Sequence, residues 1–354
     1  MVGERWLVPL ELGAGAPAAR QAQIRLWAQS SALGPSGRLC LHPVFPIADT
    51  RRVKDAMTSP SRLRQVFVGR GGLRGGWRFA VFAVFWYASG YILFPLVGLV
   101  HRFSKTGFTP EDLLAYKLAD TLYMIAGSAL LVRWEKHRMS WFGFGLEASS
   151  LKLLGAGWLW GFTMVTLLLL VCGACGYVSY AGLAAQGADL WKYLWVWLAG
   201  MLLVGLDEEL QFRGYALASL SRGIGFWPAA MFLSLIFAGD HLLNKPMENV
   251  PDVLNLVLFG LFTCYSVLRT GSLWFAIGFH ASFDFFAMSF YGSPNTGNAG
   301  MPLEHHLLDT RIAGPTWLTG GPQGLEASWL VPLLLFAMTL LLRRLYPADR
   351  YPHD

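Results

Sequence analysis

The sequence predicts an all-α, polytopic membrane protein, a bundle of about eight transmembrane helices. Of its 354 residues, 54% are hydrophobic and only 14% are charged, whereas soluble domains carry about a quarter charged residues. The apolar residues form long runs instead of recurring at the period of an amphipathic helix or strand. The 15 Trp and 12 Tyr suit a protein with two membrane–water interfaces.

Eight apolar runs are expected to cross the membrane. Only helices and closed barrels satisfy every backbone polar group in lipid, and runs of this length exclude barrel strands of about ten residues. The fourth run is expected to continue as helix to about residue 220. The expected spans are 79–100, 113–132, 157–181, 189–206, 227–243, 252–269, 272–290 and 326–342.

The segments outside these spans divide the chain. Residues 1–77 hold short apolar stretches broken by Pro, Gly and Arg, which do not fit a signal peptide. We expect a partly disordered cytoplasmic extension there, a membrane domain at 78–345 and a tail at 346–354. Because Met57 is a plausible alternative start, residues 1–56 are expected to be either a disordered extension or an artefact of start-site choice, which mass spectrometry of the native N-terminus would decide.

The net charge of +6 indicates membrane topology and not nucleic-acid binding. The basic residues lie mostly in short segments between apolar runs, and cytoplasmic segments are the ones enriched in Lys and Arg. Both termini are therefore expected in the cytoplasm, with the chain in a bacterial inner membrane. The basic residues assigned to the cytoplasmic side are Arg62, Arg64, Arg70, Arg74, Arg78, Arg133, Lys136, Arg138, Lys152, Arg222, Arg269, Arg343 and Arg344. The opposite loops carry fewer, among them Arg102, Lys105, Lys245 and Arg311.

Three groups of ionisable residues interrupt the apolar runs, where such residues mark functional sites by default. In the first, Asp207 precedes Glu208 and Glu209, and Arg213 lies four residues after Glu209, so that these two can pair on one helix face. Glu208 then points about 100° away and can face a cavity as a general base. The alternative is an acidic cap that marks the end of a span.

The second and third groups contain histidines. Phe237 and His241 share one helix face, and so do His280 and Asp284, because each pair is four residues apart. An aspartate so placed can accept a hydrogen bond from the imidazole and fix its tautomer. The alternatives are a hydrogen-bonded packing histidine for the second group and a self-satisfied polar pair for the third. Together, the three groups could form a general base, a water site and an oxyanion partner, or a metal site.

The chain resembles the CAAX prenyl protease and bacteriocin-processing family of intramembrane proteases, also called the abortive-infection type. The family's E-E-x-x-x-R, F-x-x-x-H and H-x-x-x-N/D motifs read E-E-L-Q-F-R at 208–213, F-A-G-D-H at 237–241 and H-A-S-F-D at 280–284. The resemblance covers about 189–290, with weaker likeness at 73–78 and 314–321.

The resemblance implies a role for each motif residue. Glu208 is implied as the base that activates water, and His241 and His280 as the residues that position the water and the scissile carbonyl. Asp284 takes the position of an oxyanion-stabilising Asn. Since an ionised Asp repels an oxyanion, Asp284 must be protonated or must orient His280. The implied supporting residues are Glu209, Arg213 and Phe237.

The cofactor is expected to be none or one zinc ion. The family is often labelled metalloprotease, and Glu208, His241 and His280 could bind zinc with a water in the fourth position. The zinc-protease motif H-E-x-x-H is absent from the sequence, which favours a glutamate-activated water without metal. The C-x-x-C pair Cys172 and Cys175 is expected to pack as small apolar residues, with redox or metal chemistry as the alternative.

The expected function is therefore an intramembrane endopeptidase acting on a peptide or membrane-protein substrate. Glu208 can reach His241 only if one long helix runs through the first motif and buries Glu208, so we expect the two groups within about 10 Å. A non-catalytic scaffold, immunity factor or regulator is the first alternative. A proton-coupled carrier is the second, although the sequence shows no inverted repeat. His305 and His306 are expected to be a solvated loop pair.

Overall fold

The computed structural model describes residues 66–69, 72–104, 109–245 and 247–351. The chain divides into two units, Met1–Pro60 and Ser61–Asp354, and all of the described residues belong to the second. The predictions about the N-terminal extension and about Met57 lie outside the described residues.

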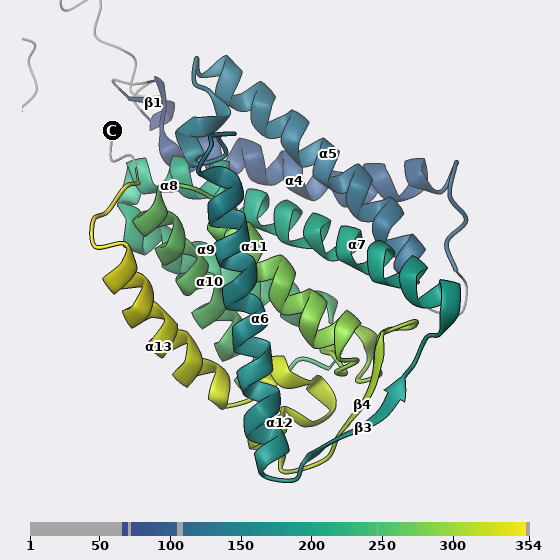
Figure 1. Ribbon diagram of the computed structural model, residues 1–354. Coiled ribbons are helices and arrows are strands. Elements are labelled where there is room, and N and C mark those ends of the chain that lie inside the picture. The colour runs from purple at the N-terminus through teal and green to yellow at the C-terminus, as the bar shows by residue number, and fades with distance from the viewer. Residues whose placement is uncertain (1–65, 70–71, 105–108, 246, 352–354) are drawn as a thin grey trace, which may run out of the picture. The chain divides into compact units, whose positions relative to one another are not determined.

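The described part is mostly helical, as the sequence predicts, and each expected span overlaps a helix or two consecutive helices (Figure 1). Five segments of the described part are long and apolar enough to cross a membrane. They are α4 (Gly75–Val97), α6 (Ser150–Ala174), the continuous segment Gly187–Ile224, α9 (Phe226–Asn244) and α10 (Val250–Thr270).

Three further helices account for the other expected spans. The first, α5, is 25 residues long but carries Lys117 and Asp120 in its middle. The other two are shorter, with 11 and 16 residues. Their bounds are Pro110–Trp134 for α5, Trp274–Asp284 for α11, which continues as the π-helical turn η2 (Phe285–Phe290), and Leu330–Leu345 for α13.

The helix through the first motif is long, which confirms the expectation that it continues beyond residue 206. Helix α7 (Gly187–Arg213) contains the whole motif, and α8 (Tyr215–Ile224) follows directly after Gly214. Glu208 therefore lies within a helix, five residues before its end.

The predicted third span, 157–181, is wrong at both ends. Helix α6 begins earlier and ends at Ala174, and Gly176 adopts a positive φ of 80° that turns the chain out of the helix. Residues Val178–Leu183 then form β3, which pairs antiparallel with β4 (Leu308–Ile312). A second short antiparallel pair joins β1 (Val68–Gly69) and β2 (Gly72–Leu73).

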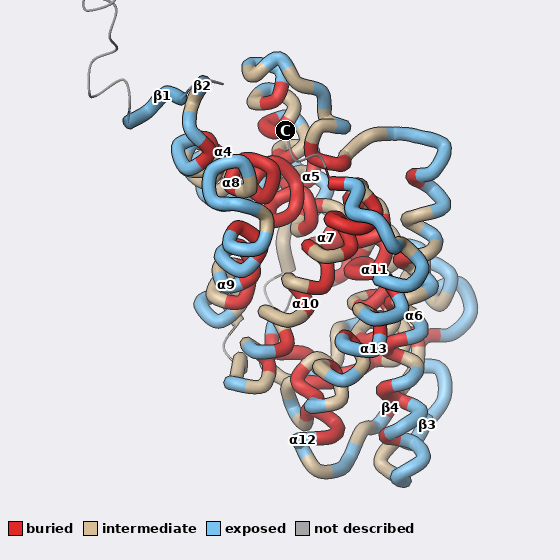
Figure 2. The backbone as a smooth tube through the Cα atoms, turned by 90° about the vertical axis from the view of Figure 1, so that its left-hand side faces the viewer, coloured by how far each residue is buried: buried red, intermediate tan, exposed pale blue. Residues whose placement is uncertain are grey.

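Glycines bring α6, α7 and α11 close together beside the motif that contains His280. A Cβ on Gly157 of α6 would lie 2.1 Å from the carbonyl oxygen of Phe275, and one on Gly205 of α7 would lie 2.8 Å from the amide nitrogen of Ala281. Only glycine permits such approaches, as is common where membrane helices pack. Helix α11 is thus held between α6 and α7, and Figure 2 shows it among the most buried parts of the described unit.

The two ends of the bundle differ in composition. One end, called the basic end here, carries Arg78, Arg222, Arg269, Arg343 and Arg344, at the start of α4 and the ends of α8, α10 and α13. The opposite end carries loop 291–329, which contains β4 (Figure 1). The short helices outside the bundle are η1 (Met139–Phe142), η3 (Thr296–Asn298), α12 (Thr316–Thr319), η4 (Gly321–Gln323) and η5 (Leu325–Ala327).

Candidate active site

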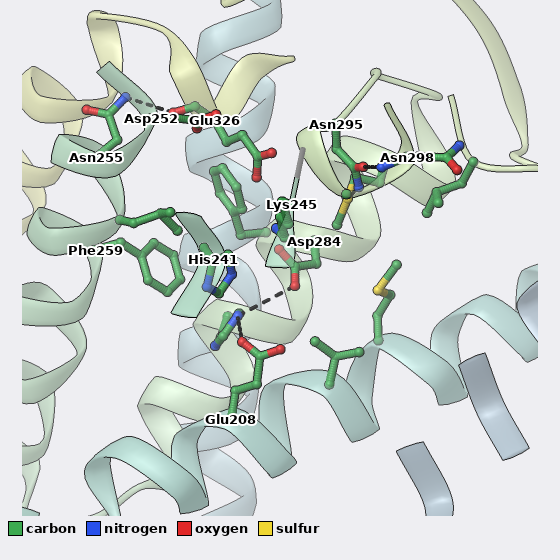
Figure 3. A pocket seen from close by; sticks show the side chains of 18 of the residues that line it. Glu208, His241, Lys245, Asp252, Asn255, Phe259, Asp284, Asn295, Asn298 and Glu326 are labelled. Carbon is green, nitrogen blue, oxygen red and sulfur yellow. Dashed lines mark hydrogen bonds and ion pairs between the residues drawn. The ribbon is translucent and has the colours of Figure 1, made fainter. Parts of the chain in front are cut away.

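A cavity of about 320 Å³ lies among α5, α7, α9, α10, α11 and loop 291–329. It has room for several water molecules. Figure 3 shows side chains from all three motifs directed into this space. The polar side chains that line it are Lys117, Trp197, Glu208, His241, Lys245, Asp252, Asn255, His280, Asp284, Asn295, Asn298 and Glu326.

The adjacent glutamates of the first motif point in different directions. The Glu208 carboxylate lines the cavity, 19% exposed, with Oε2 3.7 Å from Nε2 of His280 and Oε1 3.8 Å from Nζ of Lys117. Neither contact is short enough for a hydrogen bond. Glu209 is fully buried on another face of α7. The prediction that Glu208 faces a cavity is confirmed.

Glu209 joins the first motif to the third. Its Oε1 accepts from Nη1 of Arg213 at 3.2 Å, as the spacing predicts, and is 2.8 Å from Nδ1 of His280. Because an ionised carboxylate only accepts, Nδ1 of His280 carries a proton. The other ring nitrogen, Nε2, then faces the cavity. Such a carboxylate contact fixes both the tautomer and the orientation of an imidazole.

His241 is oriented in the same way by its own helix. Its Nδ1 lies 3.0 Å from the carbonyl oxygen of Phe237, one turn earlier in α9. A carbonyl oxygen can only accept, so Nδ1 is the protonated nitrogen and Nε2 is left with a lone pair. Both His241 and His280 line the cavity that Glu208 lines. The structure therefore brings the three motifs to one place.

Asp284 approaches the cavity side of His280. Its Oδ2 is 3.5 Å from Nε2 of His280, and its side chain is 14% exposed. The acceptor for Nδ1 is Glu209 and not Asp284, so the tautomer of His280 is set from the first motif. Asp284, like Glu208, keeps its carboxylate without a hydrogen bond from the described residues.

Two lysines in the cavity were missed by the sequence reasoning. Nζ of Lys117 is 2.7 Å from Oδ2 of Asp207, which is fully buried and also accepts from Gln211. The sequence did indicate a functional position at Lys117, because Lys117 and Asp120 are two ionisable residues inside an expected span. Lys245 comes directly after α9, where the sequence indicated only a loop residue.

Whether the site can bind a zinc ion depends on how its ligand side chains are arranged. Glu208, His241 and His280 are ligand types that zinc accepts. Within the part of the chain that the structure describes, however, no group of three or more His, Cys, Asp or Glu is arranged to hold a metal ion. The residues as placed do not fit a zinc site. Cys172 is buried and Cys175 is exposed, and neither forms a disulfide.

These features define an integral, multi-pass membrane protein with a polar cavity among its helices. Residues 190–286 match the family described as type II CAAX prenyl endopeptidase Rce1-like. That segment contains all three motifs, so the resemblance recognised in the sequence is confirmed over it, and the family indicates an intramembrane protease.

A curated relative is also similar to part of the chain. The uncharacterized protein YyaK of Bacillus subtilis (strain 168) is 27% identical over 167 residues, which are 44% of this chain and 54% of YyaK. The chain thus spans about half the length of this relative. No solved structure matches the chain.

Proposed function

We propose that the protein is an intramembrane endopeptidase in which Glu208 activates a water molecule. The observation that carries the proposal is the meeting of Glu208, His241 and His280 in one cavity of about 320 Å³. A carboxylate without hydrogen bonds costs free energy inside a membrane protein. Glu208 and Asp284 retain such carboxylates at the place where the three motifs meet, which suits a reacting centre better than a structural one.

Each step can be assigned to a group. Glu208 takes a proton from water, whose oxygen forms a bond to the peptide carbonyl carbon as the carbonyl π electrons move to oxygen. Nε2 of His241 accepts from the water and orients it. Glu209 holds the ring of His280 through Nδ1, which leaves Nε2 beside the carboxylates of Glu208 and Asp284. When the tetrahedral intermediate collapses, Glu208 returns the proton to the departing amine.

The orientation and the substrate are part of the same proposal. Cytoplasmic segments are enriched in Lys and Arg, so the basic end and both termini lie in the cytoplasm of a bacterial inner membrane. The substrate is a peptide or a segment of a membrane protein. Because Asn295, Asn298 and Glu326 of loop 291–329 line the cavity, this orientation places its lining loop on the extracytoplasmic side.

The test is Glu208→Gln, which keeps the size of the side chain but removes the base. Purified protein in liposomes would be incubated with a peptide library, and products identified by mass spectrometry. We expect the cleavage rate to fall by about 10²–10⁴-fold, with an unchanged melting temperature.

Glu147→Gln is the matched control, because Glu147 is exposed and does not line the cavity. It should cleave as the parent does. Retained cleavage in Glu208→Gln would refute the assignment of the base. Identical peptide profiles in the parent, in Glu208→Gln and in empty liposomes would favour the non-catalytic alternative.

A further inference from the structure

The polar groups that line the cavity differ in whether they donate or accept hydrogen bonds. Glu208, Asp284 and Nε2 of His241 are acceptors. An attacked carbonyl group develops negative charge on its oxygen, and that oxygen needs donors already in place. Nε2 of His280 is an acceptor as well, because its proton is on Nδ1. The reaction proposed above therefore requires a donor that is not among these four groups.

Most donor side chains that line the cavity already have an acceptor. Lys117 donates to Asp207, and Trp197 donates to the carbonyl oxygen of His305. The same holds for five others, each with its side-chain N–H directed at a carboxylate, a carbonyl oxygen or a sulfur. They are His241, Asn255, His280 and the pair Asn295 and Asn298 of loop 291–329.

Lys245 is the exception among the described residues that line the cavity. Its ammonium group has no hydrogen bond and no ion pair within 4.0 Å in the described part of the chain. It follows His241 by one helical turn, and its backbone N–H closes α9 on the carbonyl oxygen of His241. Figure 3 shows its side chain between His241 and Asp284.

The position of Lys245 is fixed by its surroundings. A Cβ built on Gly297 would lie 3.5 Å from Cε of Lys245, so the stem of the lysine runs along loop 291–329. Burial acts against the charged form, but attraction by Glu326, Glu208 and Asp284 outweighs it and raises the pKa of Lys245 above its ordinary value. The ammonium group therefore stays charged beside the reacting groups.

An ammonium group without an acceptor is costly to bury. Water can satisfy it in the resting protein, and a negatively charged ligand atom satisfies it better. Asp284 increases the need for a positively charged donor, because its carboxylate lies where the resemblance implies an amide donor. A negative charge at that point repels an oxyanion unless a positive charge offsets it.

We propose that Lys245 is the oxyanion donor of the site and that it acts with Asp284 in place of an amide side chain. The inference rests on the proposed peptidase function. As the bond from water to carbon forms and the carbonyl π bond breaks, the oxygen takes the electron pair and accepts an N–H hydrogen bond from Lys245. No proton is transferred, and the lysine stays an ammonium ion.

The first test is kinetic and uses the library peptide that the parent cuts fastest. Lys245→Met is expected to lower kcat by about 10²–10³-fold, the effect of losing one oxyanion donor, with KM within about threefold. Lys245→Arg, which keeps a charged donor, should retain more activity. Lys192→Met is the control, since Lys192 is half-exposed and pairs with Glu111 away from the cavity.

The second test separates a catalytic from a structural role. In Lys245→Met, the further change Asp284→Asn removes the uncompensated carboxylate and supplies an amide donor. We expect kcat to recover at least about tenfold, the effect of one restored donor. An unchanged kcat in Lys245→Met would overturn the proposal. So would a loss confined to KM, or a loss of kcat that Asp284→Asn does not restore.

A third measurement needs no turnover. A pool of short peptides ending in a phosphonate mimics the tetrahedral oxyanion, and its binding can be followed by the melting temperature of the protein in detergent. The parent and Glu208→Gln should both bind, and Lys245→Met should bind at least about tenfold more weakly. Equal affinity in the parent and Lys245→Met, or no binding to the parent, would overturn the role of Lys245. Because Glu208→Gln cleaves no peptide yet should bind this pool, failure of the base assignment is distinguishable from failure of the donor assignment.

Discussion

Two charged groups at the basic end are paired with each other, whereas two carboxylates in the cavity have no hydrogen-bond partner among the described residues. At the basic end, Arg78 pairs with Glu135 at 3.0 Å, and the hydroxyl of Tyr215 donates to the same carboxylate at 2.6 Å. In the cavity, Glu208 and Asp284 have no hydrogen bond from the described residues. Paired charges hold helices together, whereas unpaired ones leave atoms available to a ligand. Substitutions at the two places should therefore affect different properties.

The largest loss of stability is expected directly behind the cavity, where Arg213 and Glu209 are buried as a pair. Arg213→Met leaves the Glu209 carboxylate in the core with His280 as its one described partner. Removing one member of a buried ion pair costs about 3–5 kcal/mol. We expect the free energy of unfolding in detergent to fall by that amount, as measured by denaturant titration.

Arg222→Met is the comparison for this variant. The Arg222 guanidinium lies over the ring of Trp141 at 4.7 Å, at an exposed position, and its loss should cost about 0.5–1 kcal/mol. Equal effects of the two substitutions would mean that the buried pair contributes no more than a surface contact.

A smaller effect is expected at the basic end. The double-mutant cycle of Arg78→Met and Glu135→Gln should give a coupling free energy of about 1–3 kcal/mol, because the two side chains are in contact and nearly buried. Peptide cleavage per folded molecule should not change. A loss of cleavage equal to that of Glu208→Gln would mean that the charged pair at the basic end is needed for cleavage as much as the cavity carboxylate is.

No effect is expected from removing metal ions. If Glu208 activates water without zinc, cleavage by purified protein in a strong chelator should match cleavage without it, and metal analysis should find less than one zinc per chain. Stoichiometric zinc together with chelator-sensitive cleavage would show that the cavity side chains rearrange around a metal. It would also move the role of Glu208 from base to ligand.

The sequence predicted the helices and the shared faces of the motif residues because both follow from local rules, whereas the meeting of the three motifs was expected from their combination and from the family resemblance. An apolar run long enough to cross a membrane has few alternatives to a helix, and residues four apart share a face. The i,i+4 pair of Glu209 and Arg213 was predictable on this ground alone.

The parts that were not predicted depend on contacts between distant segments. The contact of Glu209 with His280 joins residues 71 positions apart, and the strand β3 exists because it pairs with β4 across more than a hundred residues. Lys245 follows the end of a helix, where periodicity says nothing about the direction of a side chain. Lys117 could have been found, since a lysine inside an apolar run demands a partner.

The adjacent carboxylates on α7 have a consequence for how the chain can change over evolutionary time. Successive residues on a helix point about 100° apart, so one added residue before Asp207 would leave α7 intact but turn it by that angle. The core position would then receive Glu208 in place of Glu209, and Asp207 would face the cavity. The number of residues between the packing surface of α7 at Gly205 and the site is therefore fixed.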